Sequence, residues 1–336
     1  MPQKVPFIFQ LTALWAFVEV ALGGVLHALR IPFTGVVIGG TAVAIISIIG
    51  QNSQRPWRDI MSATGLVLMV KAGASPHAPL PAYIAVAFQG LLGALIFQWF
   101  RFYRISVVLF ALLAMLESGL QKLLLLTLFY GKSLWVALDV FIESVLKSFH
   151  LQSDTTGSQL IVVIYISIYA FWGLYLGIRL ATFSKRADAY VKLWKASPVL
   201  EISSNLSSVW NVKRNRNLFW LIYLAIILVM CFVLISFGKQ KYDLFYVVSR
   251  SMAAIFVVFW IVNPLFSYWI KRKANSGSIK LQIQAISNQF VFLQNDYFRA
   301  LQIIGGPRWQ PLRYFRAMEM LIAVTLVKDH ETTPNA

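Results

Sequence analysis

Five polar side chains lie within stretches of the chain that are otherwise apolar, and their types suit ligand binding. They are Glu19, Lys71, Gln89, Glu117 and Lys122. An ionisable group at membrane depth is expensive unless it faces a cavity or a partner, so each is a candidate functional residue. A few polar groups in an apolar cavity fix the orientation of a bound small molecule. We therefore predict that these five residues bind a small-molecule ligand.

Glu19 stands out among the five because it lies near the middle of a long apolar run. A carboxylate there can contact a ligand, carry a proton or pair with a cation. The alternative is a structural ion pair with an interior lysine, and Lys71 or Lys122 is able to supply the partner. His27 lies eight positions further on, and a lone histidine there is more often a packing residue.

Motifs of known catalytic and metal sites are absent from the sequence. It contains no HExxH, GxSxG, P-loop or GxGxxG pattern, one cysteine and four scattered histidines. We therefore predict no catalytic residue, no metal site and no cofactor, and we expect the protein not to be an enzyme. An alternative is a membrane enzyme that acts on a lipid or isoprenoid substrate. Such an enzyme requires acidic side chains that converge on one cleft, whereas Asp59, Asp188 and Glu201 are widely spaced in the sequence.

The composition is that of a polytopic helical membrane protein. Hydrophobic residues make up 58% of the 336 residues, and charged residues only 13%. Apolar runs long enough to cross most of a bilayer predict an all-α fold with about eight transmembrane helices and additional cytoplasmic amphipathic helices. The predicted spans are 9–29, 34–50, 60–76, 81–100, 105–130, 158–183, 217–238 and 245–270.

The distribution of the 30 Lys and Arg residues predicts the orientation in the membrane. With both termini cytoplasmic, most of the basic residues fall on the inner side, as the positive-inside rule requires. We therefore expect an integral protein of a bacterial cytoplasmic (inner) membrane. The net charge of +17 is explained by this topology and by membrane lipids as partners, so we predict no nucleic-acid partner.

Changes in composition divide the chain into four predicted parts. Residues 1–183 form a six-span bundle with the ligand pocket, and 184–216 form a basic interfacial linker in which Trp194 suits the headgroup region. Residues 217–270 form a two-span hairpin. Residues 271–336 form amphipathic helices and a short disordered tail.

The tail contains one long helical seam of apolar residues. They recur at alternating spacings of four and three: Ile279, Ile283, Ile286, Phe290, Leu293, Tyr297 and Ala300. Gly305, Gly306 and Pro307 end this helix, and a second helix is predicted at about 309–328. The two helices pack on each other or on the bilayer surface, or else the seam docks another protein.

Small residues recur in the first predicted hairpin, 11–50, and predict a closely packed interior element. With the Pro-rich stretch at 76–81, this hairpin makes residues 9–183 resemble the S component of energy-coupling-factor vitamin transporters. Ala13, Ala16 and Ala21 resemble the alanine-based docking surface of that family, although their spacing is not its AxxxA motif. The resemblance implies six spans, an outward-facing vitamin pocket, and coupling through a transmembrane T component to paired ATPases.

These observations predict a membrane transport protein that binds a vitamin-like small molecule in its six-helix bundle. Its C-terminal region is expected to couple the bundle to a partner, such as a transmembrane coupling subunit or an ATPase. Two alternatives stay open: the lipid or isoprenoid enzyme, and a membrane scaffold that recruits a soluble partner. The scaffold predicts a bundle interior filled by side chains, with Glu19 held in an ion pair.

Overall fold

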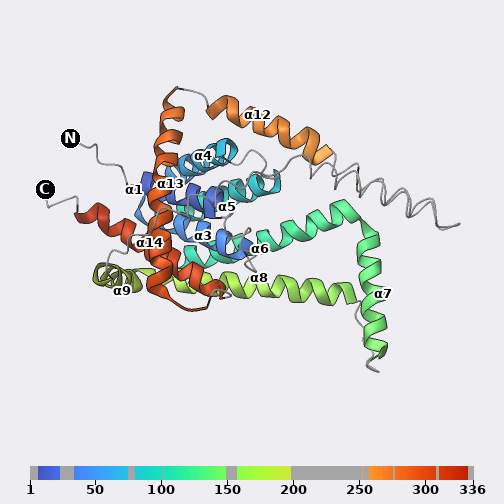
Figure 1. The fold of residues 1–336 in the computed structure, drawn as a ribbon. Coiled ribbons are helices and arrows are strands. Elements are labelled where there is room, and N and C mark those ends of the chain that lie inside the picture. The colour runs from blue at the N-terminus through green and yellow to red at the C-terminus, as the bar shows by residue number, and fades with distance from the viewer. Residues whose placement is uncertain are drawn as a thin grey trace. The chain divides into compact units, whose positions relative to one another are not determined.

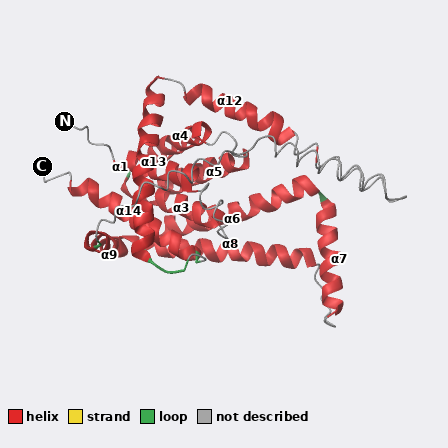
Figure 2. Cartoon of the chain, in the orientation of Figure 1, coloured by secondary structure: helices red, strands yellow, loops and turns green. Residues whose placement is uncertain are grey.

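The computed structural model describes nearly all of the N-terminal half and the C-terminal tail of the chain. The described residues are 7–22, 34–74, 80–100, 102–148, 157–197, 252, 257–274, 277–307 and 310–331. Within these ranges the secondary structure is helical, with no strand (Figure 2). The all-α prediction is therefore confirmed for the part of the chain that the structure describes.

Five of the described helices match the predicted runs 34–50, 60–76, 81–100, 105–130 and 158–183, and Figure 1 shows the described helices together. The first half contains α1 (Phe7–Phe17), the π-helical turn η1 (Val18–Leu22), α3 (Thr34–Asn52), α4 (Pro56–Ala74), α5 (Leu80–Trp99) and α6 (Tyr103–Tyr130). The elements that follow are α7 (Lys132–Ser148), α8 (Gly157–Ala181), α9 (Phe183–Ala196), η3 (Val257–Val262), α12 (Asn263–Ala274), α13 (Gly277–Ile304) and α14 (Pro311–Glu331).

Three of the described helices are long and apolar enough to cross a membrane: α5, α6 and α8. They match three of the predicted spans. Large apolar side chains on α8 remain exposed, including Ile168, Phe171 and Ile178. Extended apolar surface of this kind marks contact with lipid or with another protein. The three helices fit a membrane protein, and the expected count of about eight spans goes beyond them.

The hydrophobic core is centred on α1 and α3, as the small residues of the first hairpin predicted. Leu11, Leu14 and Trp15 of α1 are fully buried, and so are Ile45 and Ile46 of α3. Both helices therefore lie in the interior. The connection between them, 23–33, which includes His27, lies outside the described residues.

Helices α4 and α5 pack closely because a glycine lies at their contact. A Cβ atom built on Gly90 would lie 2.1 Å from Oγ1 of Thr64, closer than real atoms approach. Small residues permit such close approach between helices in a membrane. Any larger side chain at position 90 would push the two helices apart.

The two tail helices belong to the same packed body as α1 and α3. Helix α13 contacts α1, α4 and α14, and in Figure 1 it runs crosswise to α4. The predicted seam is its inner face, with Ile286, Tyr297 and Ala300 buried. Helix α13 ends at the expected glycines, because Gly305 and Gly306 adopt positive φ angles of 64° and 88°.

Helix α14 is buried nearly all round, from Tyr314 to Thr325, with Arg316 exposed. It contacts α3, α9 and α13. A helix of modest hydrophobicity is therefore an interior element. Its burial depends on the surrounding helices, which the apolar spacing of its own sequence does not reveal.

The chain separates into two compact units whose boundaries differ from the four predicted parts. The first unit combines 1–120, 165–202 and 263–336, and the second combines 121–164 and 203–262. The tail therefore joins the N-terminal bundle in one unit, because its apolar seam and α14 pack against α1 and α3. The predicted boundary at 183/184 lies inside the first unit, at the start of α9.

The second unit contains α7, a helix with no buried residue. The Asp139 carboxylate accepts a hydrogen bond from the backbone N–H of Ser158 at the start of α8, at 2.6 Å. An exposed ion pair joins Glu143 and Lys147 one turn apart on α7, at 2.7 Å.

Candidate functional site

Glu19 lies in the π-helical turn that follows α1. The turn, Val18–Leu22, departs from regular α geometry at the position of the carboxylate. Single π turns within helices occur often at functional sites, because the extra residue changes the direction of neighbouring side chains. The sequence identified the residue but not this backbone feature.

Lys71 is the partner of Glu19. Its Nζ atom lies 2.7 Å from Oε2 of Glu19, and the two side chains are only 6% and 7% exposed. The same ammonium donates a hydrogen bond to the backbone carbonyl of Ala82 at 3.3 Å and lies 5.8 Å from the centre of the Tyr83 ring. The pair therefore joins η1, α4 and α5, and it is the ion pair anticipated as the structural alternative for Glu19.

Gln89 is also buried, on the same helix as Ala82 and Tyr83. A Cβ atom built on Gly39 of α3 would lie 3.5 Å from the Nε2 atom of Gln89 and 3.3 Å from Cε of Met115 on α6. The amide therefore lies where α3, α5 and α6 meet.

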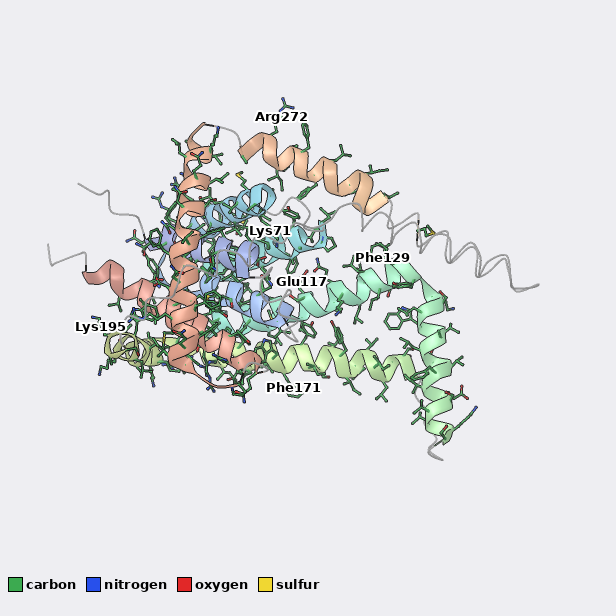
Figure 3. The ribbon with its side chains drawn as sticks, viewed as in Figure 1. Lys71, Glu117, Phe129, Phe171, Lys195 and Arg272 are labelled. Carbon is green, nitrogen blue, oxygen red and sulfur yellow. The ribbon has the colours of Figure 1, made fainter. Side chains whose placement is uncertain are left out.

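Glu117 and Lys122 differ from the other predicted residues. Oε2 of Glu117 is buried and has no hydrogen-bond partner among the described residues. Lys122 is exposed and belongs to the second unit. Figure 3 labels Lys71 on α4 and Glu117 on α6, both in the first unit. The structure thus joins Glu19 to Lys71 directly, and no contact links Gln89 or Glu117 to that pair within the described part.

A second buried charge centre surrounds Glu319 of α14, whose side chain is fully buried. Its carboxylate receives hydrogen bonds from Arg179 of α8, the shortest at 2.6 Å, and from Arg186 of α9 at 3.1 Å. The Tyr190 hydroxyl donates to the same carboxylate at 3.0 Å. This centre therefore ties α14 to both α8 and α9.

The sequence did not reveal this centre. Its one signal was Arg179, a charged residue at the end of an apolar run. Arg179 and Glu319 lie 140 positions apart, so no spacing rule relates the two. Burial, and then the charge of Glu319, raises the pKa of Tyr190 to about 12. The tyrosine therefore keeps its proton and donates to the carboxylate at neutral pH.

Trp194 was expected at the level of the lipid headgroups, but the structure buries it. The Arg299 guanidinium of α13 lies 4.2 Å from the centre of its ring and donates to the backbone carbonyls of Trp194 and Ser197 at the end of α9. Helix α13 covers this face of α9, so Trp194 packs against protein, and its depth in the membrane stays a prediction.

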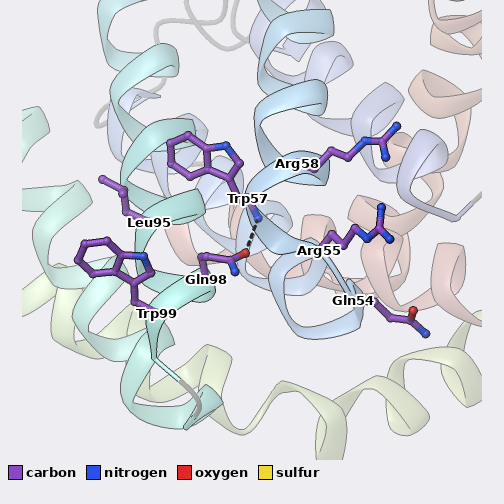
Figure 4. A pocket seen from close by; sticks show the side chains of 7 residues that line it. All are labelled: Gln54, Arg55, Trp57, Arg58, Leu95, Gln98 and Trp99. Atoms are coloured by element: carbon purple, nitrogen blue, oxygen red, sulfur yellow. Dashed lines mark hydrogen bonds between the residues drawn. The ribbon is translucent and has the colours of Figure 1, made fainter.

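The surface beside the start of α4 and the end of α5 forms an open groove of about 530 Å³. It is lined by Gln54, Arg55, Trp57, Arg58, Leu95, Gln98 and Trp99. Figure 4 shows the tryptophans and Leu95 on one side, and the two guanidinium groups extending to the other. The groove therefore has an apolar wall and a basic margin.

Two of the three acids considered for an enzyme, Asp59 and Asp188, lie within the described residues, on different helices. Asp59 of α4 accepts a hydrogen bond from the Ser53 hydroxyl, and Asp188 lies on α9. Within the described ranges, no cluster of three or more His, Cys, Asp or Glu residues is arranged to hold a metal ion. Glu201, the Pro-rich stretch 75–79, the predicted linker from 198 and the predicted span 217–238 lie outside the described residues.

Comparisons with known proteins returned no match. No family model matches the chain, and neither a curated protein nor a solved structure is significantly similar to it.

Proposed function

We propose that this chain is an integral membrane transport protein that binds a small, vitamin-like molecule at the Glu19–Lys71 pair. The observation that carries the proposal is the buried ion pair between Glu19 in the π-helical turn and Lys71 on α4. In this proposal the chain has about eight spans and both termini in the cytoplasm of a bacterium. The C-terminal region couples the bundle to a transmembrane subunit or an ATPase.

The bonding capacity of the pair supports a role in binding. A lysine ammonium has three donors. The Lys71 ammonium donates hydrogen bonds to two acceptors within the described residues, the Glu19 carboxylate and the Ala82 carbonyl. Glu19 has one recorded hydrogen bond within the described residues. Each member of the pair thus retains capacity for a polar ligand that approaches between η1 and α4.

The energetics of buried ion pairs point the same way. Removing two charges from water costs several kcal/mol per ion, and replacing such a pair with apolar residues is often neutral or stabilising. Stability alone is therefore a weak reason for placing Glu19 opposite Lys71. A ligand with its own charged or polar group can replace either Glu19 or Lys71 as the partner of the other residue. The pair then serves as a binding site.

Gln89 and Glu117 provide further polar groups in this proposal. Gln89 presents a buried amide at the junction of three helices, and Glu117 presents a buried carboxylate oxygen with no partner among the described residues. Lys122 is exposed and belongs to the second unit, so it is not assigned to this site.

The experiment compares the wild type with Glu19→Gln, Lys71→Gln and the double variant. Each protein is purified from native membranes in mild detergent, and mass spectrometry identifies the small molecules and proteins that remain bound. We expect the wild type to retain a small molecule and coupling subunits, and the double variant to lose the small molecule while remaining folded. Glu143→Gln, in the exposed pair on α7, is the matched control.

A membrane scaffold is the second candidate, because Glu19 is held in an ion pair and the core around α1 and α3 is filled by side chains. The scaffold predicts that no small molecule is retained by any form. It also predicts that the double variant recovers the same soluble partner as the wild type. A folded double variant that loses a small molecule contradicts the scaffold, whereas unchanged recovery of proteins without any small molecule contradicts transport.

A further inference from the structure

The groove between the start of α4 and the end of α5 has the chemistry of a lipid-headgroup site. We infer that it binds an anionic phospholipid. Arg55 and Arg58 hold the phosphate-bearing headgroup, and Trp57, Leu95 and Trp99 contact the glycerol and the first part of the acyl chains. The inference requires only a membrane-embedded chain and is independent of transport.

The position of the groove agrees with this ligand. Helix α5 is apolar along its length and long enough to cross a membrane, and it ends at Trp99. Trp99 is 77% exposed, and Phe102, which follows it, is 75% exposed. Exposed aromatic side chains at the end of a span are typical of the interface between the bilayer and water. The groove therefore lies at headgroup depth.

The charge of the groove is not neutralised by an ion pair within the part of the chain that the structure describes. Neither Arg55 nor Arg58 forms an ion pair with an acidic side chain of the described residues. Asp59, the nearest acid in the sequence, accepts a hydrogen bond from the Ser53 hydroxyl, and that hydroxyl also accepts from the Arg55 backbone N–H. Two guanidinium groups three residues apart at the beginning of a helix therefore remain available to an anion.

The apolar wall selects a lipid over a free anion. Trp57 and Trp99 stand on the side of the groove opposite the guanidinium groups (Figure 4). Gln98 holds this arrangement by accepting a hydrogen bond from the backbone N–H of Trp57 at 3.3 Å. An inorganic anion uses only the basic margin, whereas a phospholipid places its phosphate there and its glycerol and chains against the indole rings.

The experiment measures lipid preference in the full-length protein. The purified chain is placed in nanodiscs of phosphatidylcholine and phosphatidylglycerol with identical acyl chains, and the bound lipids are counted by native mass spectrometry. We expect the wild type to enrich phosphatidylglycerol. Arg55→Gln with Arg58→Gln is expected to reduce that enrichment on the order of thirty-fold, at roughly five-fold for each basic residue near the surface.

The control removes the same charge elsewhere: Lys280→Gln with Arg316→Gln changes two exposed basic residues on α13 and α14. It should retain the enrichment. A second readout uses brominated phosphatidylglycerol, which quenches nearby indoles; the part of the quenching that depends on Arg55 and Arg58 should be lost in Trp57→Phe with Trp99→Phe. Because all these positions are exposed, the variants are expected to fold.

Three results would overturn the inference. The first is equal loss of enrichment in the control and in the groove variant, which would show an effect of net charge alone. The second is enrichment that survives in the groove variant. The third is binding of inorganic phosphate in phosphatidylcholine nanodiscs that depends on Arg55 and Arg58, without any preference for phosphatidylglycerol over phosphatidylcholine.

Discussion

The two buried charge centres of the first unit differ in how completely their carboxylates are satisfied. Glu319 receives hydrogen bonds from two arginines and a tyrosine, and the group ties three helices together. Among the residues that the structure describes, one side chain, Lys71, donates to Glu19. A fully satisfied carboxylate acts as a structural clamp, whereas a singly satisfied one keeps capacity for another partner. The difference makes Glu19 the better candidate for ligand exchange.

The largest effect is expected from Glu319→Ala. This change leaves the Arg179 and Arg186 guanidinium groups without their carboxylate in a buried setting, and removing one partner of a buried pair typically destabilises by about 3–5 kcal/mol. Thermal unfolding of the purified protein in detergent measures the change. Glu143→Ala, which breaks the exposed pair on α7, should shift stability by at most about 0.5 kcal/mol. Similar shifts for the two variants would show that the Glu319 centre is not a clamp.

A smaller and more complex effect is expected at the Glu19–Lys71 pair. Lys71→Met alone leaves an uncompensated carboxylate and should destabilise by several kcal/mol, while adding Glu19→Gln should recover most of that loss. The same double variant should still fail to retain the small molecule. Unfolding curves and mass spectrometry on the same samples separate the two outcomes. If the double variant recovers its stability and also retains the small molecule, the ligand binds at a site other than the Glu19–Lys71 pair.

Tyr190→Phe tests one hydrogen bond within the clamp. The Glu319 carboxylate loses one donor but keeps both arginines, so the expected loss of stability at neutral pH is about 1 kcal/mol. Thermal or chemical unfolding detects it. No change would indicate that the arginines alone satisfy the carboxylate.

The smallest effect is expected at alkaline pH, where the difference in stability between the wild type and Tyr190→Phe should change. The folded pKa of Tyr190 is raised to about 12 from the ordinary value of 10, so the folded state holds this proton more tightly. Its contribution is fully present below pH 10 and is lost as pH rises through 12. The wild type should therefore lose its advantage over Tyr190→Phe across this range. A constant gap between the two proteins would contradict the raised pKa.

Much of the local structure was predictable because it depends on nearby residues. The apolar runs correctly predicted helices α5, α6 and α8, and the alternating spacing in the tail correctly predicted α13. The helix stop at Gly305 follows from the backbone freedom of glycine. Glu19 was recognisable as unusual, and Lys71 was one of its two named partners, because a charge in an apolar run has few ways to be compensated.

The tertiary structure decided the rest. It chose Lys71 over Lys122 for Glu19, because α4 lies beside η1 and Lys122 is exposed. It also buried α14 and placed Glu319 against Arg179, although the two lie 140 positions apart. The sequence by itself determines helices and the residues that need partners, because propensity and hydrophobicity act locally. Which helix supplies each partner is set by packing between distant segments, and that is a property of the fold alone.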